Sequence, residues 1–229
     1  MTHRDTRPAA VLWDLDGTLI DSEPYWITAE KEIARKFGVE WTDDDGLTLV
    51  GKPLPLSATL LIERGVDMAA EDIIQYLLKR VTDAVHERIP WQPDARALLD
   101  EVVSAGIPCA LVTMSYSTLA QASLTLIPGV FAVVVTGDEV THGKPHPESY
   151  LLAAQRLGVD IADCVAIEDS PSGIAAAYDS GAHTIAVKRL TPIEPRPGLS
   201  RVTSLDRMGL DGLYGVVNGE VFDELGSQT

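Results

Sequence analysis

Two aspartates near the N-terminus have a spacing that suggests chemistry. A short apolar run over residues 10–13 indicates a buried strand, and Asp14 and Asp16 follow it directly. Two carboxylates placed two positions apart at a strand end cannot both be buried without a counter-charge. The rest of the chain must therefore supply one.

Other polar residues follow apolar runs much later in the chain. Thr113 follows Cys-Ala-Leu-Val, Lys144 lies within Gly-Lys-Pro-His-Pro, and Glu168 and Asp169 follow Cys-Val-Ala-Ile. Each alone has an ordinary structural explanation: Thr113 as a hydroxyl at a strand end, Lys144 as a surface lysine, and Glu168 and Asp169 as a helix cap. In an open parallel sheet, however, the carboxyl ends of the strands share one edge, where ligands bind. We therefore expect these residues to meet the aspartate pair in one active site.

A helical segment is expected between the first strand and the rest of the core. Apolar residues recur with helical spacing over residues 25–37, 55–63 and 70–89, most clearly in the last of these ranges. Proline-containing segments flank this region on both sides. We predict an α-helical cap subdomain over residues 22–89, inserted into an α/β core formed by residues 1–21 and 90–229.

The chain then alternates between helices and strands. Helices are expected from an N-cap at Asp94 to Gly106 and over 117–126, 147–157 and 172–180, and strands over 109–113, 131–135, 164–168 and 184–187. Repeated βα units imply a parallel sheet covered by helices on both faces. The expected fold class is therefore α/β, with a Rossmann-like doubly wound sheet. Residues 198–229 are expected to add a short strand or helix, and they carry no residues to which we assign chemistry.

Composition limits the classes of partner. The 229 residues carry a net charge of −16, which argues against nucleic acid or an anionic membrane as a partner. No apolar run approaches the ~20 residues of a membrane span, and the N-terminus lacks a signal-peptide core. Cys109 and Cys164 lie in expected strands and are interpreted as buried free thiols. We expect a cytoplasmic protein, either a monomer or a homodimer.

Together these residues resemble the four motifs of the haloacid dehalogenase superfamily. The matching segments, in order along residues 10–188, are Asp14-Leu-Asp-Gly-Thr18, Thr113, Gly-Lys144-Pro-His-Pro and Ile-Glu168-Asp169-Ser-Pro-Ser-Gly. The chain is most similar to the phosphatase and β-phosphoglucomutase-like branch, which has a helical cap after the first motif. The resemblance implies phosphoryl-transfer chemistry on a small phosphorylated metabolite.

The resemblance gives the acidic residues their roles. Asp14 is the candidate nucleophile that forms an aspartyl-phosphate, and Asp16 is the candidate general acid and then base. A hard divalent cation, Mg²⁺, is expected to be held by Asp14, the backbone carbonyl of Asp16, and Asp169. Glu168 is either a further ligand or a partner outside the coordination shell.

The remaining candidates contact the phosphate or the rest of the substrate. Thr113 and the adjacent backbone amide are expected to hold a phosphoryl oxygen, and Lys144 to neutralise both the phosphate and the aspartate. Further expected substrate contacts are Gly17, Thr18, Met114 and Ser115 in the core and Gly51 and Lys52 in the cap. Gly46 to Lys52 also matches Gly-x₄-Gly-Lys, but Pro53 stands where a nucleotide-binding loop needs Ser or Thr. We reject that interpretation.

Hydrolysis is favoured over related reactions. Asp16 argues against halide or phosphonate chemistry, because those branches lack this acid. Trp26 stands where β-phosphoglucomutases carry a histidine, and Thr18 replaces their usual valine. We therefore predict a Mg²⁺-dependent phosphomonoester hydrolase, with a sugar-phosphate mutase as the alternative. A phosphoacceptor receiver domain does not fit this length or motif order, and a non-catalytic module would be expected to have lost one aspartate. Sugar phosphates, phosphoglycolate and nucleoside monophosphates all remain open as substrates.

Overall fold

A parallel sheet forms the centre of the molecule. The computed structural model describes residues 7–50, 52–125 and 127–226. Within them the sheet has six strands in the order β3-β2-β1-β4-β5-β6. Their bounds are β1 (Ala10–Trp13), β2 (Cys109–Val112), β3 (Val133–Val135), β4 (Cys164–Glu168), β5 (His183–Val187) and β6 (Ser200–Val202). All pairings are parallel, and this order is that of a Rossmann-like doubly wound sheet, which confirms the predicted fold class.

The first strand lies between two strands that come much later in the sequence. Val11 is in register with Cys109 of β2 and with Val165 of β4. Every residue of these three strands is buried, which explains their continuous apolar runs in the sequence, broken only by Glu168 at the end of β4. Cys109 and Cys164 are buried free thiols at the starts of β2 and β4, as expected.

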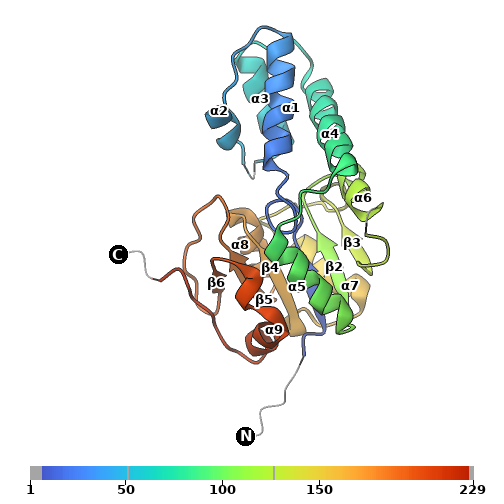
Figure 1. Ribbon diagram of the computed structural model, residues 1–229, viewed down its shortest axis with the longest axis vertical. Helices are drawn as coiled ribbons and strands as arrows, with labels where there is room; N and C mark the ends of the chain where they lie inside the picture. The colour runs from blue at the N-terminus through green and yellow to red at the C-terminus, as the bar shows by residue number, and fades with distance from the viewer. Residues whose placement is uncertain (1–6, 51, 126, 227–229) are drawn as a thin grey trace, which may run out of the picture.

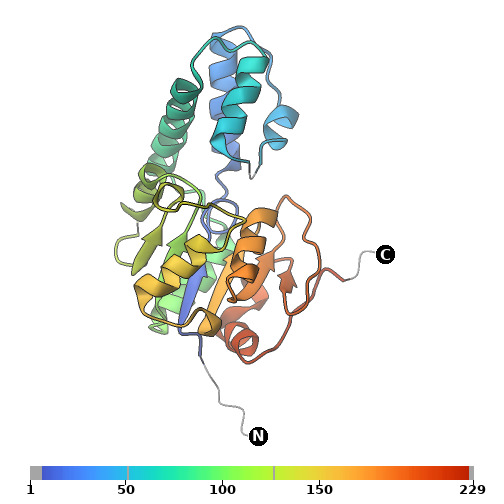
Figure 2. The ribbon, with the colours of Figure 1, turned by 180° about the vertical axis from the view of Figure 1, so that it is seen from behind.

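Helices cover both faces of the sheet (Figures 1 and 2). Alternate residues of β1 point to opposite faces, so Val11 and Trp13 join one apolar cluster, and Ala10 and Leu12 join another. Helices α5 (Pro93–Ser104) and α9 (Gly209–Val217) contribute to the first cluster, and α7 (Glu148–Leu157) and α8 (Pro171–Asp179) contribute to the second. The remaining core elements are α6 (Ser117–Thr125), η1 (Gly137–Glu139), η2 (Ile161–Asp163) and η3 (Leu205–Arg207).

A block of four helices extends from the end of β1 (Figure 1). It contains α1 (Glu23–Lys36), α2 (Asp43–Leu47), α3 (Leu54–Glu63) and α4 (Ala70–Glu87). The apolar face of α4 is buried and packs against α1 and α3. The three expected helices are confirmed to within two residues at each end, whereas α2 was not predicted. Among the described residues, no helix has the length and apolarity that a bilayer crossing needs.

The two segments that join this block to the core pair with each other. Ile20 and Trp91 form an antiparallel bridge, and the Asp21 N–H donates to the Pro90 carbonyl at 2.8 Å. The Gln92 N–H donates to the Leu19 carbonyl at 2.9 Å. We place the boundary between the proposed cap, residues 22–89, and the proposed core at this paired connection.

The interpretation of Asp94 as a helix N-cap was wrong. Helix α5 begins at Pro93, and Gln92 occupies the N-cap position without a side-chain capping bond. The Asp94 carboxylate instead accepts two hydrogen bonds from the Arg189 guanidinium, at 2.7 and 3.0 Å, and one from the Leu205 N–H. Asp94 therefore pairs with Arg189, which lies far along the chain, and does not cap the helix as its local sequence context suggests.

Candidate active site

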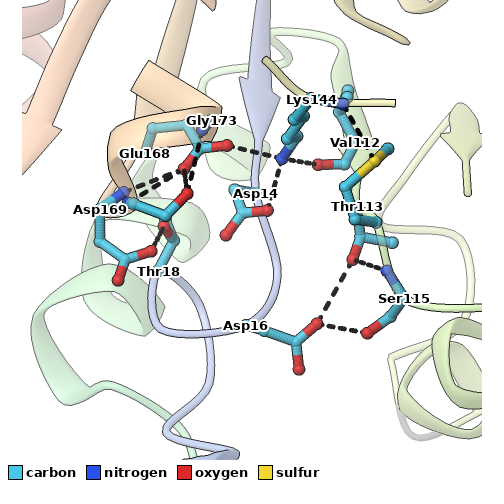
Figure 3. Close-up of polar contacts among 12 residues, drawn as sticks. Asp14, Asp16, Thr18, Val112, Thr113, Ser115, Lys144, Glu168, Asp169 and Gly173 are labelled. Carbon is cyan, nitrogen blue, oxygen red and sulfur yellow. Dashed lines mark hydrogen bonds and ion pairs between the residues drawn. The ribbon is translucent and has the colours of Figure 1, made fainter. Parts of the chain in front are cut away.

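The carboxyl ends of three neighbouring strands bring the candidate residues together (Figure 3). Asp14 follows β1, Thr113 follows β2, and Glu168 ends β4 with Asp169 directly after it. Lys144 joins them from the loop between η1 and α7. β1 and β4 are the pair at which the strand order reverses, and ligands of open α/β sheets bind at this point.

The Lys144 ammonium is buried between two carboxylates. Its Nζ donates to Asp14 Oδ1 at 2.7 Å, to Glu168 Oε1 at 2.5 Å and to the Val112 carbonyl at 2.9 Å. Burial by itself would lower the pKa of Lys144, but the charges of Asp14 and Glu168 raise it above its ordinary value. The lysine is therefore charged throughout the physiological range. The Lys144–Pro145 peptide bond is cis.

Glu168 is fully buried, and hydrogen-bond donors surround its carboxylate. Besides Lys144, it accepts from the Tyr150 hydroxyl at 2.8 Å, the Asp169 N–H at 3.1 Å, and the N–H and hydroxyl of Ser170. The start of α8 approaches so closely that a Cβ built on Gly173 would lie 1.8 Å from Glu168 Oε1. Glycine at this position is what lets the carboxylate fit under the helix.

Asp169 is held by residues of the loop that follows Asp16. The Thr18 hydroxyl donates to Asp169 Oδ1 at 2.9 Å and is itself fully buried. Gly17 has a φ of +88°, and a Cβ there would lie 2.3 Å from Asp169 Oδ2, so both the backbone and the contact require glycine. Burial and the charge of Glu168 raise the pKa of Asp169 to about 7.

Asp16 points to the other side of the site, toward hydroxyl groups (Figure 3). Ser22 donates to Asp16 Oδ1 at 2.6 Å, and Ser115 donates to Oδ2 at 2.6 Å. The Thr113 hydroxyl lies 3.4 Å from Oδ2 and accepts the Ser115 N–H at 2.9 Å. These hydrogen bonds fix the orientation of the Asp16 carboxylate. Its partial exposure leaves it accessible from solvent.

The cluster has the composition of a divalent cation site. One carboxylate oxygen from each of Asp14, Glu168 and Asp169 lies within 4.8 Å of the others. When all three carboxylates are ionised they carry three negative charges, and Lys144 balances only one of them. Burial, and then the charge of Glu168, raise the pKa of Asp14 against the opposing effect of Lys144. A buried excess of two negative charges on oxygen donors fits a hard divalent cation such as Mg²⁺.

The other predicted substrate contacts have different surroundings. The Met114 sulfur accepts the Lys144 N–H at 3.2 Å, so this side chain is directed at the lysine loop. Lys52 is exposed and lies between α2 and α3 in the helical block. The described residues give the Lys52 side chain no hydrogen bond to the core. Gly51 lies outside the described residues.

Sequence reasoning missed Glu23, which faces the site from the first turn of α1. Burial, and then the charges of Asp16 and Asp169, raise the pKa of Glu23 to about 8. None of the described residues donates a hydrogen bond to its carboxylate. In the sequence it is only an acidic residue at a helix start, a position that the helix dipole favours. The proline that follows it marked the helix start but gave no sign of the direction of the side chain.

The chain belongs to the haloacid dehalogenase-like hydrolase family, whose model matches residues 11–187. It is 36% identical over 181 residues to hexitol phosphatase A of Escherichia coli, covering 77% of this chain and 81% of that protein. It is 33% identical over 185 residues to the bifunctional riboflavin kinase/FMN phosphatase of Arabidopsis thaliana. That match covers 80% of this chain but spans only 49% of the plant protein.

Solved structures with the same architecture include CbbY of Rhodobacter sphaeroides in complex with xylulose 1,5-bisphosphate. The TM-score is 0.78 at 26% identity, over 90% of this chain and 99% of that one. A putative β-phosphoglucomutase from Thermotoga maritima gives a TM-score of 0.72 at 28% identity, over 91% and 96% of the two chains. The resemblance to the phosphatase and β-phosphoglucomutase-like branch is thus confirmed, and the chain is an enzyme of phosphatase type.

Proposed function

We propose that this chain is a Mg²⁺-dependent phosphomonoester hydrolase that acts on a small phosphorylated metabolite, through a phosphoryl group carried on Asp14. The observation that carries the proposal is the Asp14 carboxylate at the end of β1. One of its oxygens accepts from Lys144, and no described residue donates to the other. Relatives named as phosphatases support the same reaction class.

In this proposal Asp14 and Lys144 act together on the phosphoryl group. Lys144 holds one Asp14 oxygen, so the other is oriented toward substrate. That oxygen forms a bond to phosphorus while the bond from phosphorus to the leaving alcohol oxygen breaks. Water then attacks the aspartyl-phosphate, which releases phosphate and restores the carboxylate. The buried positive charge of Lys144 attracts the phosphoryl oxygens throughout.

Asp16 is proposed to move the protons of both steps. It gives a proton to the leaving alcohol oxygen in the first step and takes one from the attacking water in the second. Its hydrogen bonds to Ser22 and Ser115 fix its orientation at the edge of the site. Ser22 belongs to the connection to the helical block, so the placement of the acid depends on that connection.

The metal would be held by Asp14, Asp169 and the Asp16 backbone carbonyl. Bound there, Mg²⁺ supplies positive charge that lets a phosphate dianion approach carboxylates. We place Glu168 outside the coordination shell, because its two oxygens already accept hydrogen bonds from Lys144, Tyr150 and backbone N–H groups. Its role is to position Lys144. Thr18 is likewise a positioning residue, because its hydroxyl donates to Asp169 and so orients that carboxylate.

The helical block is proposed to close over the site as a cap that selects the leaving group. Glu23 offers a partly buried carboxylate, without a donor among the described residues, next to the reacting groups. With its pKa raised to about 8, this carboxyl group would be protonated at neutral pH and could both donate to and accept from sugar or polyol hydroxyls. Lys52 would reach the substrate from the α2–α3 connection. A sugar or polyol phosphate is therefore the substrate class we propose, in line with the relative named hexitol phosphatase A.

The proposal is tested by phosphate release from p-nitrophenyl phosphate and a panel of metabolite phosphomonoesters. The panel would contain hexitol phosphates, phosphoglycolate, FMN, nucleoside monophosphates and β-glucose 1-phosphate. Release that needs Mg²⁺, stops with chelator and is abolished in Asp14→Asn is expected. Release that persists in Asp14→Asn would contradict the proposal. A matched control is Asp21→Asn, an exposed aspartate in the same loop, which should retain activity.

A sugar-phosphate mutase is the second candidate, favoured by the likeness to a putative β-phosphoglucomutase. Mutase activity would convert β-glucose 1-phosphate to glucose 6-phosphate without net release of phosphate. Trp26 stands where mutases carry an assisting histidine, and here it packs against the apolar cluster. Phosphate release should therefore exceed isomerisation.

A further inference from the structure

Two histidines and a glutamate meet on the loop before α7, separate from the cluster around Asp14. His142 and His146 flank Lys144 in the sequence, and Glu148 is the first residue of α7. His142 Nδ1 lies 3.0 Å from Glu148 Oε2, and His146 Nδ1 lies 4.0 Å from the same oxygen. One ligand atom from each of the three side chains lies within 4.8 Å of the others. Both histidines are exposed, so dissolved ions can reach the cluster.

The separations between these atoms are close to those that a transition-metal ion imposes on its ligands. Zn²⁺ binds imidazole nitrogen and carboxylate oxygen at about 2.0–2.2 Å with tetrahedral geometry, which places its ligands about 3.3–3.6 Å apart. The observed separations of 3.0 and 4.0 Å lie on either side of that range. Small side-chain rotations would complete the site, and water would take the fourth position, as in zinc sites with three protein ligands.

The loop holds these donors in place before any ion binds. The Glu148 carboxylate accepts the N–H groups of Thr141 at 2.8 Å and His142 at 2.9 Å. The Thr141 hydrogen bond is the main cause that lowers the pKa of Glu148 and keeps it ionised. His146 Nδ1 accepts the Glu148 N–H at 3.2 Å, a hydrogen bond that directs this nitrogen toward Glu148 and that a bond to the metal ion would replace. Two prolines in the loop restrict its backbone further, which reduces the entropy lost on binding.

We propose that His142, His146 and Glu148 form a second metal site, which binds Zn²⁺. Imidazole donors select zinc over magnesium, whereas the oxygen donors around Asp14 select the harder ion. The proposed zinc site would thus differ in its metal preference from the oxygen donors around Asp14. Zinc binding would tie the loop that carries Lys144 to the start of α7. This inference does not rest on the phosphatase proposal.

The test is calorimetric titration of Zn²⁺ into the full-length, chelator-stripped protein with Mg²⁺ in large excess. The excess Mg²⁺ competes for the oxygen donors around Asp14, and a variant that keeps those donors but lacks both histidines accounts for any Zn²⁺ that binds there. The wild type is expected to bind one Zn²⁺, and His142→Ala/His146→Ala should weaken that binding by roughly tenfold or more. His86→Ala changes an exposed histidine of α4 and should bind like the wild type.

Co²⁺ provides a second readout with the same variants. The wild type loaded with Co²⁺ should show the visible absorption of a four-coordinate nitrogen and oxygen site, and the double variant should lack it. Circular dichroism would confirm that the variants, changed only at exposed positions, remain folded. Equal Zn²⁺ binding by the wild type and the double variant, or no binding by either, would overturn the proposal.

Discussion

Replacing Lys144 with methionine tests how charge is balanced in the candidate active site. The ammonium is nearly inaccessible to solvent and pairs with Asp14 and Glu168, both of which are also buried. Methionine keeps an unbranched apolar chain of similar length, so packing is largely retained while the charge is lost. The change therefore leaves two neighbouring carboxylates in the protein interior without their cation.

The expected cost follows from measured ion pairs of this kind. Removing one partner of a buried pair destabilises a protein by about 3–5 kcal/mol, because the other charge stays buried. For a chain of this size, that corresponds to a fall in Tm of roughly 6–20 °C. The loss should shrink toward pH 5, because burial and the charge of Glu168 raise the pKa of Asp14, and without the opposing charge of the lysine this carboxylate takes up a proton more readily.

The assay is urea denaturation followed by circular dichroism, with chelator present, at pH 7.5 and pH 5. Lys144→Met/Glu168→Gln should recover part of the loss. The amide oxygen can accept the Asp169 and Ser170 N–H groups, and the amide NH₂ can donate to the Tyr150 hydroxyl.

A surface change provides the matched control, and a small effect would refute the reasoning. Lys79→Met removes an exposed pair with Asp83 on α4 and should change stability by no more than about 0.5 kcal/mol. If Lys144→Met were destabilised no more than this control at pH 7.5, then Lys144 would not be balancing ionised carboxylates.

Three further predictions concern other buried polar groups. Burial raises the pKa of Glu30 to about 7, so the stability that it contributes is complete below about pH 4.5 and is lost as the pH rises through 7. The free energy of unfolding should therefore decrease between pH 5 and pH 8. In Glu30→Gln that decrease should be smaller by up to about 3 kcal/mol, as measured by denaturation at the two pH values. Equal pH dependence in both proteins would contradict it. Gly173→Ala should displace the Glu168 carboxylate and lower both kcat and Tm, so an unchanged kcat would count against the proposed positioning of the lysine. Arg189→Met should destabilise the fold by about 3–5 kcal/mol by leaving Asp94 unpaired, and Arg189→Lys should restore only part because lysine cannot donate in bidentate fashion. Full rescue by lysine in thermal denaturation would argue against this reading of the pair.

The strand ends could be predicted because short-range and long-range signals agree there. Each of Asp14, Thr113 and Glu168 lies directly after, or at the end of, a run of buried apolar residues. A parallel sheet then brings those ends to one edge whatever the exact strand order. The amphipathic helix α4 could be predicted for a similar reason, since its apolar period repeats over several turns.

Other features depend on contacts that no local pattern encodes. Helix α2 has five residues, too few for a helical period to emerge. Asp94 has the sequence context of a helix cap, but its partner Arg189 comes from beyond β5. Tyr150 looks like a core residue of α7, yet its hydroxyl donates to Glu168. In each case a tertiary partner decides the role of the side chain.

Trapping the phosphoryl group on Asp14 as a stable derivative tests the proposed aspartyl-phosphate. The protein would be mixed with Mg²⁺ and its best substrate from the panel, then quenched and treated with borohydride, which reduces an acyl-phosphate to an alcohol. Peptide mass spectrometry should find homoserine at position 14 only when both substrate and Mg²⁺ are present. Phosphate release without homoserine at that position, or with trapping at another aspartate, would contradict the account.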